Sequence, residues 1–156
     1  MIFRSLFASA VTALALTALV SAAQAPQAPA RTIWDGIYTT QQAEYGAFLY
    51  GANCARCHGD SLAGRADDDG DAAPLVGAEF WRTHQGKTLD SMFTVMKTRM
   101  PLTSPGSLRD SDYASILAFI LSVNEFPAGA TELPATALGL SSFRFVDAPA
   151  APAPAN

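Results

Sequence analysis

Two cysteines and a histidine stand together as Cys54-Ala55-Arg56-Cys57-His58, and this segment constrains the chain more than any other. The sequence holds no further cysteine, and a bridge between these two would close too small a loop to stabilise a fold. Both thiols therefore require a chemical explanation. The spacing Cys-x-x-Cys-His is the attachment pattern of a c-type haem, because two thiols so spaced can add to the two vinyl groups of one porphyrin. His58 is then expected to be the proximal ligand of the iron.

Other chemistries use similar residues and remain as alternatives. A thioredoxin-like dithiol places its CxxC at the end of a strand that opens a helix, whereas this CxxC follows a predicted helix. A zinc site requires four ligands, and beyond Cys54, Cys57 and His58 the chain offers His84 as its remaining histidine. A chance occurrence of the pattern is the third alternative. The directly following histidine favours haem over all three.

An iron that transfers electrons needs a second axial ligand that stays bound in both oxidation states. Met100 is the predicted ligand, because it begins a loop rich in Pro, Gly and Ser from which a flexible thioether can reach over the porphyrin. Met92 and Met96 lie four residues apart on a predicted amphipathic helix, which favours core packing. His84 is the alternative ligand and would give a bis-histidine haem. Ligation by His58 and Met100 predicts a relatively oxidising one-electron carrier.

The amino terminus has the pattern of a secretory signal. Arg4 supplies a positive charge, residues 6–20 are apolar, and small residues permit cleavage after Ala23 or Ala25. A retained membrane anchor is the alternative, but the apolar run is shorter than the ~20 residues of a spanning helix. We therefore expect a signal peptide over 1–23, a flexible leader over 24–32, a folded domain over 33–146 and a disordered Ala/Pro-rich tail over 147–156. A periplasmic location and a mature chain without a transmembrane segment follow.

Hydrophobic periodicity predicts three helices, over residues 40–53, 88–98 and 110–123. No alternating run is long enough to predict a strand, so the expected class is all-α. Lys and Arg total 10 against 14 Asp and Glu, which gives a net charge of −4. The chain therefore lacks the basic field that binding to nucleic acid requires.

Segments on both sides of the cysteines resemble class I c-type cytochromes. More narrowly, they resemble the small monohaem cytochromes that partner, or are fused to, quinoprotein alcohol and sugar dehydrogenases, which use pyrroloquinoline quinone (PQQ). The resemblance implies a cytochrome c-like fold, in which three main helices surround one covalently bound haem c and an irregular extension follows. Besides the CxxCH motif, it is carried by Gly36-Ile37-Tyr38-Thr39, Gly46 with Leu49-Tyr50, Gly59, Leu62, Gly64, Pro74-Leu75-Val76-Gly77, Met100-Pro101, Pro105-Gly106-Ser107-Leu108, and Phe126-Pro127-Ala128-Gly129 with Glu132-Leu133-Pro134.

The resemblance also implies how the first and last helices meet. In the family these helices cross at a contact between a glycine and aromatic side chains. The matching residues here are Gly46 and Tyr50 on the first helix, and Ile116 and Phe119 on the last. A glycine at this place permits close approach of the two helices.

Two further roles follow from the resemblance. In the family the histidine ligand donates its other ring proton to a backbone carbonyl, which implies that Ala73 accepts this proton from His58. The family often has a tryptophan near the place of His84, close to a haem propionate. His84 is therefore expected either to hydrogen-bond that carboxylate or to be exposed on a loop.

The function that these features imply is that of a periplasmic monohaem electron carrier. Its expected donor is a PQQ-dependent dehydrogenase, and its expected acceptor is a cytochrome or a terminal oxidase. Enzymatic turnover is not expected, because a six-coordinate iron has no open position for oxygen or peroxide. One alternative is a haem-bearing subunit fixed in a dehydrogenase complex, for which residues 126–146 supply apolar surface. Another is a five-coordinate peroxidase or gas sensor, should Met100 not bind the iron.

Overall fold

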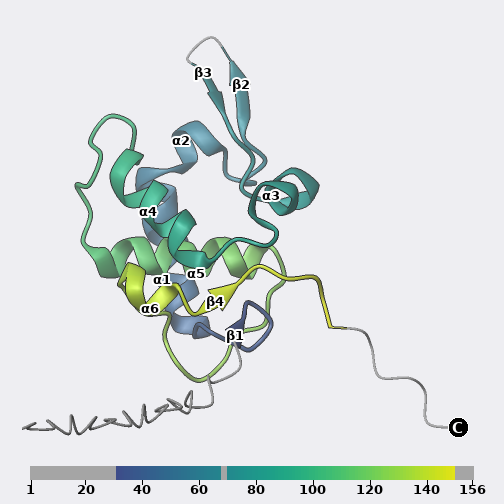
Figure 1. Ribbon diagram of the computed structural model, residues 1–156. Coiled ribbons are helices and arrows are strands. Elements are labelled where there is room, and N and C mark those ends of the chain that lie inside the picture. The colour runs from purple at the N-terminus through teal and green to yellow at the C-terminus, as the bar shows by residue number, and fades with distance from the viewer. Residues whose placement is uncertain (1–30, 68–69, 150–156) are drawn as a thin grey trace, which may run out of the picture.

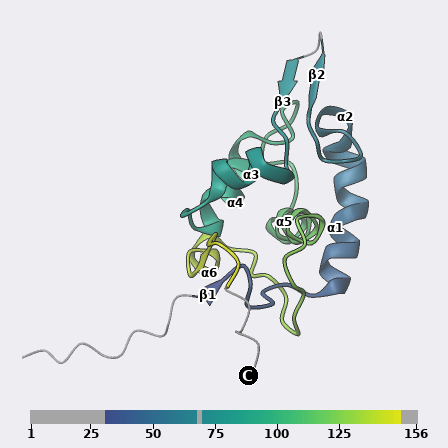
Figure 2. The ribbon, with the colours of Figure 1, turned by 90° about the vertical axis from the view of Figure 1, so that its right-hand side faces the viewer.

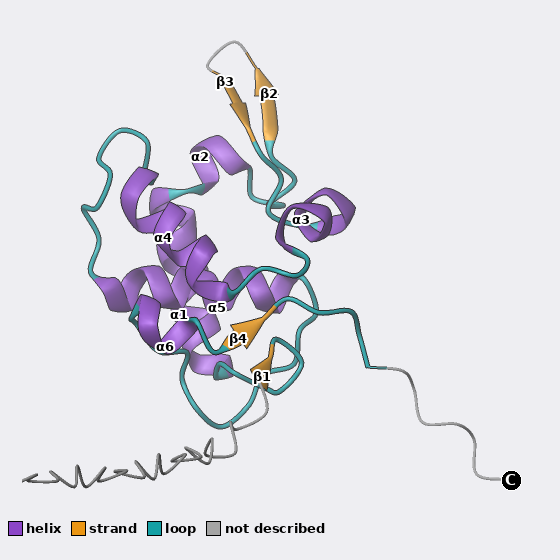
Figure 3. Cartoon of the chain, in the orientation of Figure 1, coloured by secondary structure: helices purple, strands orange, loops and turns teal. Residues whose placement is uncertain are grey.

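The computed structural model describes residues 31–67 and 70–149 of the 156-residue chain. The predicted signal peptide, most of the predicted leader and most of the predicted tail lie outside these residues. Within the described part, six helices form the body and four strands of two or three residues lie at its edges (Figure 1, Figure 3). The helices are α1 (Thr40–Asn53), α2 (Ala55–His58), α3 (Gly77–His84), α4 (Leu89–Arg99), α5 (Asp110–Val123) and α6 (Ala137–Leu140), and the strands are β1 (Arg31–Thr32), β2 (Arg65–Asp67), β3 (Gly70–Ala72) and β4 (Phe143–Arg144). The predicted all-α class is confirmed, although the sequence predicts no strand.

The three predicted helices are all present. α1 and α5 have the predicted bounds, and α4 is shifted by one residue toward the C-terminus. α1 begins where the Thr39 hydroxyl accepts a hydrogen bond of 3.1 Å from the Gln42 amide, which satisfies one of the free N–H groups of the first turn. Periodicity fails to predict α3, because this helix has eight residues and buries one side chain, Phe80.

α1 and α5 cross at very close range. A Cβ added to Gly46 would lie 1.8 Å from the carbonyl oxygen of Ser115 and 3.0 Å from the Cβ of Phe119. The rings of Tyr50 and Phe119 lie 5.3 Å apart, so the expected glycine and aromatic contact is present. The backbone of Ser115, rather than Ile116, provides the nearest atoms to Gly46. Only a residue without a side chain allows the two backbones to approach this closely.

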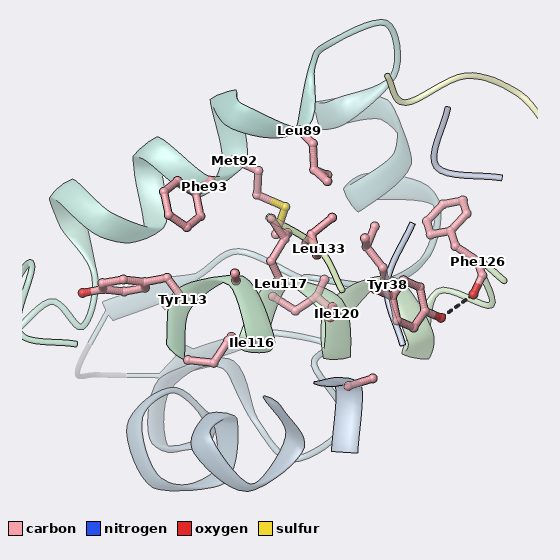
Figure 4. Close-up of a cluster of buried hydrophobic side chains, with 14 of the residues drawn as sticks. Tyr38, Leu89, Met92, Phe93, Tyr113, Ile116, Leu117, Ile120, Phe126 and Leu133 are labelled. Atoms are coloured by element: carbon pink, nitrogen blue, oxygen red, sulfur yellow. Dashed lines mark hydrogen bonds between the residues drawn. The ribbon is translucent and has the colours of Figure 1, made fainter. Parts of the chain in front are cut away.

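α4 packs on another side of α5, and the core lies between them. Figure 4 shows Met92 and Phe93 of α4 directed toward α5. Met92 is 4% exposed, which agrees with the core role that its spacing predicts, and Met96 is partly buried against the same core. The residues that α5 contributes are all fully buried or nearly so: Tyr113, Ile116, Leu117, Ile120 and Leu121.

The C-terminal segment, residues 126–146, folds back over the body. Most of its large apolar side chains are buried, Leu138 being the exposed one, and near its end β4 pairs in parallel with β1 at the start of the described chain. Arg31 pairs with Phe143 and Thr32 with Arg144, so two residues that the sequence places in a flexible leader form a strand. The buried residues of this segment are Phe126, Leu133, Leu140, Phe143 and Phe145.

β2 and β3 form an antiparallel hairpin in the connection between α2 and α3. The hairpin projects away from the helices in both views (Figure 1, Figure 2). Its base lies at Arg65 and Ala72, which are paired. None of the helices in the described residues combines the length and the apolarity that a bilayer crossing requires.

Candidate functional site

The Cys54–His58 motif forms a single turn directly after α1. The Cys54 amide donates to the carbonyl of Tyr50 at 2.8 Å and so continues the hydrogen-bond pattern of α1. The amides of Cys57 and His58 then both donate to the carbonyl of Cys54, at 3.1 and 3.0 Å. No disulfide joins the two cysteines; Cys54 is half-buried and Cys57 is exposed. Two sulfur atoms and one imidazole are thus held on one short, fixed stretch of backbone.

The ring of His58 is oriented by the backbone of Ala73. Nδ1 of His58 lies 2.9 Å from the carbonyl oxygen of Ala73, the contact that the resemblance implies. A carbonyl can only accept a hydrogen bond, so Nδ1 must carry the proton. In the neutral ring Nε2 then keeps a free lone pair, which is what a metal ion requires.

Met100 lies at the C-terminal end of α4, and its backbone is held on three sides. Its amide donates to Met96 at 3.0 Å, and its carbonyl accepts from the Tyr113 hydroxyl at 2.7 Å and from the Gly106 amide at 3.4 Å. The peptide bond from Met100 to Pro101 is cis. α1 with α2 stands on one side of α5 and α4 on the other (Figure 2). The elements that carry His58 and Met100 therefore lie on opposite sides of α5.

Apolar side chains lie close in sequence to both Ala73, the partner of His58, and Met100. Leu75 and Val76 follow shortly after Ala73, and Met96 and Leu108 lie on either side of Met100 in the sequence. All four are packed against the core but only partly covered by protein. A set of two thiols, an imidazole nitrogen, a thioether and adjoining apolar surface matches what a covalently attached iron porphyrin requires.

The family comparison agrees with this donor set. Residues 41–120 match the family model described as cytochrome c oxidase, cbb3-type, subunit III. The chain belongs to this cytochrome c family. None of the curated proteins matches the chain. The matched residues include Cys54, Cys57 and His58, so the protein binds haem c covalently and is an electron-transfer protein rather than an enzyme.

The environment of Cys54 argues against the dithiol alternative. Burial, with a smaller contribution from the charge of Cys57, raises the pKa of the Cys54 thiol to about 11. Reactive dithiol motifs instead depend on a lowered cysteine pKa. The raised pKa of the Cys54 thiol therefore does not fit a reactive dithiol.

The zinc alternative fails on ligand placement. Residues 31–67 and 70–149 contain no group of three or more His, Cys, Asp or Glu side chains arranged to hold a metal ion. Haem iron does not need such a group, because the porphyrin supplies four of its ligands.

His84 is not exposed on a loop, so that interpretation of the sequence is wrong. It is the last residue of α3, and its ring centroid lies 4.7 Å from that of Phe80 and 5.3 Å from that of Phe145. Its Nδ1 is buried, and no described residue hydrogen-bonds to it. Burial, assisted by the charge of Lys87, lowers the pKa of His84 to about 4. This environment favours a packing role for His84 over a role as iron ligand.

The structure adds two residues to the site that sequence reasoning missed. Tyr113 holds the backbone of Met100, and its position on the buried face of α5 gave no signal beyond core packing. Gly64 lies against the segment that carries Ala73. The resemblance includes Gly64, but no pattern in the sequence assigns it a role.

Proposed function

We propose that this cytochrome is a periplasmic one-electron carrier with a low-spin haem ligated by His58 and Met100. The observation that carries the proposal is the contact between His58 and Ala73, which leaves Nε2 free and fixes the direction of the ring. The anchored backbone of Met100 supports the second ligand. A thioether opposite an imidazole favours ferrous iron and so gives a relatively oxidising carrier.

In this proposal the residues of the site hold haem c in place and do not transform a substrate. Haem c supplies the one-electron chemistry of its iron. Cys54 and Cys57 tie the porphyrin to the end of α1, so it stays in place in either oxidation state. Ala73 keeps the His58 ring in one tautomer and one orientation, and Tyr113 keeps the Met100 backbone in place. A site that is held in this way needs little rearrangement when one electron enters or leaves.

The proposed electron donor is a PQQ-dependent dehydrogenase, and the proposed acceptor is a cytochrome or a terminal oxidase. The resemblance of the segments around the motif to cytochromes that partner such dehydrogenases supports the donor. Release of the haem protein by osmotic shock tests the periplasmic location, and co-purification with a quinoprotein tests the partner.

A fixed haem-bearing subunit is the second candidate function. The matched family is described as a subunit of an oxidase, which supports this candidate. The C-terminal segment supports it less, because that segment covers the protein's own core and leaves Leu138, at 87% exposed, as its outward apolar residue. Size-exclusion chromatography of solubilised membranes and soluble extract separates a free carrier from a subunit.

Replacing Met100 with Ala tests the ligand. We expect Met100→Ala to lose the weak sulfur-to-iron absorption band of the ferric protein and to become high-spin. Its reduction potential should fall, since axial ligands set haem potentials over a range of about 0.8 V. Met96→Leu, four residues earlier on α4, is the matched control and should keep the low-spin spectrum. A low-spin spectrum with the band intact in Met100→Ala would show that another residue binds the iron.

A further inference from the structure

The chain between α2 and α3 closes on itself around His58. The Gly64 amide donates to the carbonyl of His58 at 3.0 Å, and the Leu75 amide donates to the carbonyl of Leu62 at 2.7 Å. The β2–β3 hairpin extends from this region between the two contacts, and Arg65 pairs with Ala72 at its base. Backbone hydrogen bonds thus join the residues that leave His58 to those that return to it.

Within this base, Gly64 lies very close to the backbone of residues 72–74. Its φ is +78°, and an added Cβ would lie 2.3 Å from the carbonyl oxygen of Ala72, 3.0 Å from the nitrogen of Pro74 and 3.2 Å from the carbonyl carbon of Ala73. All three neighbours are backbone atoms and have no flexible side chain that could move aside. Any side chain at position 64 must therefore displace the backbone that contains the Ala73 carbonyl.

We propose that Gly64 is a positioning residue for the axial histidine, an inference that rests on the proposed ligation of iron by His58. Gly64 packs directly against residues 72–74 and so fixes the carbonyl of Ala73 in front of Nδ1. Alanine at position 73 leaves φ free, where a proline would hold it near −65°. The hairpin base and Gly64 supply that restraint instead.

The electronic consequence follows from the hydrogen bond. A carbonyl that accepts the Nδ1 proton makes Nε2 a stronger donor to the metal. A stronger donor stabilises ferric iron more than ferrous iron and lowers the reduction potential. Displacing Ala73 therefore weakens the donor and raises the potential, opposite in sign to the effect expected for loss of Met100.

Gly64→Ala in the haem-loaded protein tests the proposal. The sequence has two histidines, so ¹⁵N-histidine labelling gives two imidazoles to assign. We expect the Nδ1 proton of His58 to exchange with solvent about tenfold faster or more, as a lost hydrogen bond allows, together with an upward shift in potential. Gly86→Ala is the matched control, because Gly86 has the same φ of +78° and nothing within 4 Å of its added Cβ. It should move neither measurement.

Unchanged exchange and potential in a low-spin Gly64→Ala protein would overturn the proposal. Should that variant fail to load haem, Ala73→Gly decides instead, because it removes the restraint of residue 73 on its own backbone and leaves the close contact of Gly64 intact. Wild-type exchange and potential in Ala73→Gly would support a restraint supplied by Gly64 and the hairpin base, and faster exchange with a raised potential would overturn it. A wild-type protein that is not low-spin would contradict the proposed function itself, which keeps the two failures distinct.

Discussion

The crossing of α1 with α5 and the C-terminal segment both close the hydrophobic core, but by different means. At the crossing the helices touch through backbone, with Gly46 against the carbonyl of Ser115. The C-terminal segment is irregular and depends on a few side-chain anchors. Gln42 of α1 exchanges two hydrogen bonds with the backbone of Leu133, at 3.0 and 2.7 Å. The stability of the helix pair thus depends on how closely the two helices can approach. The stability of the irregular segment depends on whether its backbone N–H and C=O groups find hydrogen-bond partners.

The largest effect is expected at the crossing. Gly46→Ala places a Cβ 1.8 Å from a backbone oxygen, so the helices must move apart. We expect a loss of about 3 kcal/mol or more in the free energy of unfolding, measured by urea denaturation of the haem-loaded protein.

Gly51→Ala provides the control on the same helix. Gly51 is exposed and has nothing within 4 Å, so alanine should stabilise α1 by up to about 1 kcal/mol. Similar effects of the two substitutions would show that helix propensity, and not the close approach, governs position 46.

An intermediate effect is expected where α1 holds the C-terminal segment. Gln42→Leu leaves the buried N–H and C=O of Leu133 without their partner, which should cost about 2 kcal/mol. Urea denaturation measures the loss, and limited proteolysis should cleave the C-terminal segment, residues 126–146, earlier than in the wild type. Gln41→Leu, at the exposed neighbouring position, should change neither. Equal stability of Gln42→Leu and the wild type would remove Gln42 as an anchor.

The smallest effect concerns His84, which packs α3 against the C-terminal segment. The pKa of His84 is about 4 in the folded protein, below its ordinary value of 6.5. Between these values the unfolded chain binds a proton that the folded protein does not, so stability falls as the pH decreases from 6.5 to 4 and falls no further below it.

His84→Phe removes this titration. The stability difference between wild type and variant should change by about 1 to 2 kcal/mol between pH 7 and pH 4, because partial exposure reduces the full effect. Urea midpoints at both pH values measure it. A constant difference would mean that His84 is protonated as easily in the folded protein as in the unfolded chain.

The long helices could be predicted because the pattern that specifies them lies within each helix's own sequence. α1 and α5 are long enough for their apolar positions to repeat, and both have the bounds that periodicity predicts. α3 is too short to show a repeat, and the hairpin at Arg65 to Ala72 has no alternation of apolar residues. The path of the C-terminal segment depends on contacts such as Gln42 with Leu133, which lie 91 residues apart.

The candidate site divides in the same way. The spacing of Cys54, Cys57 and His58 identifies the haem attachment, and the resemblance adds the carbonyl of Ala73. The role of Gly64 could not be predicted, because it depends on how closely two returning stretches of backbone approach each other. Phe80 lies four residues before His84 on α3, but the second aromatic neighbour, Phe145, reaches α3 only through the fold of the C-terminal segment.

The pairing of β1 with β4 brings the two ends of the described fold together. Both strands lie at the opposite end of the molecule from α2, as the two perpendicular views agree (Figure 1, Figure 2). A linker attached before Arg31 or after Asp147 would therefore hold this cytochrome on an electrode with the Cys54–His58 turn directed toward solution. The choice of terminus for immobilisation should make little difference to the orientation of the bound protein.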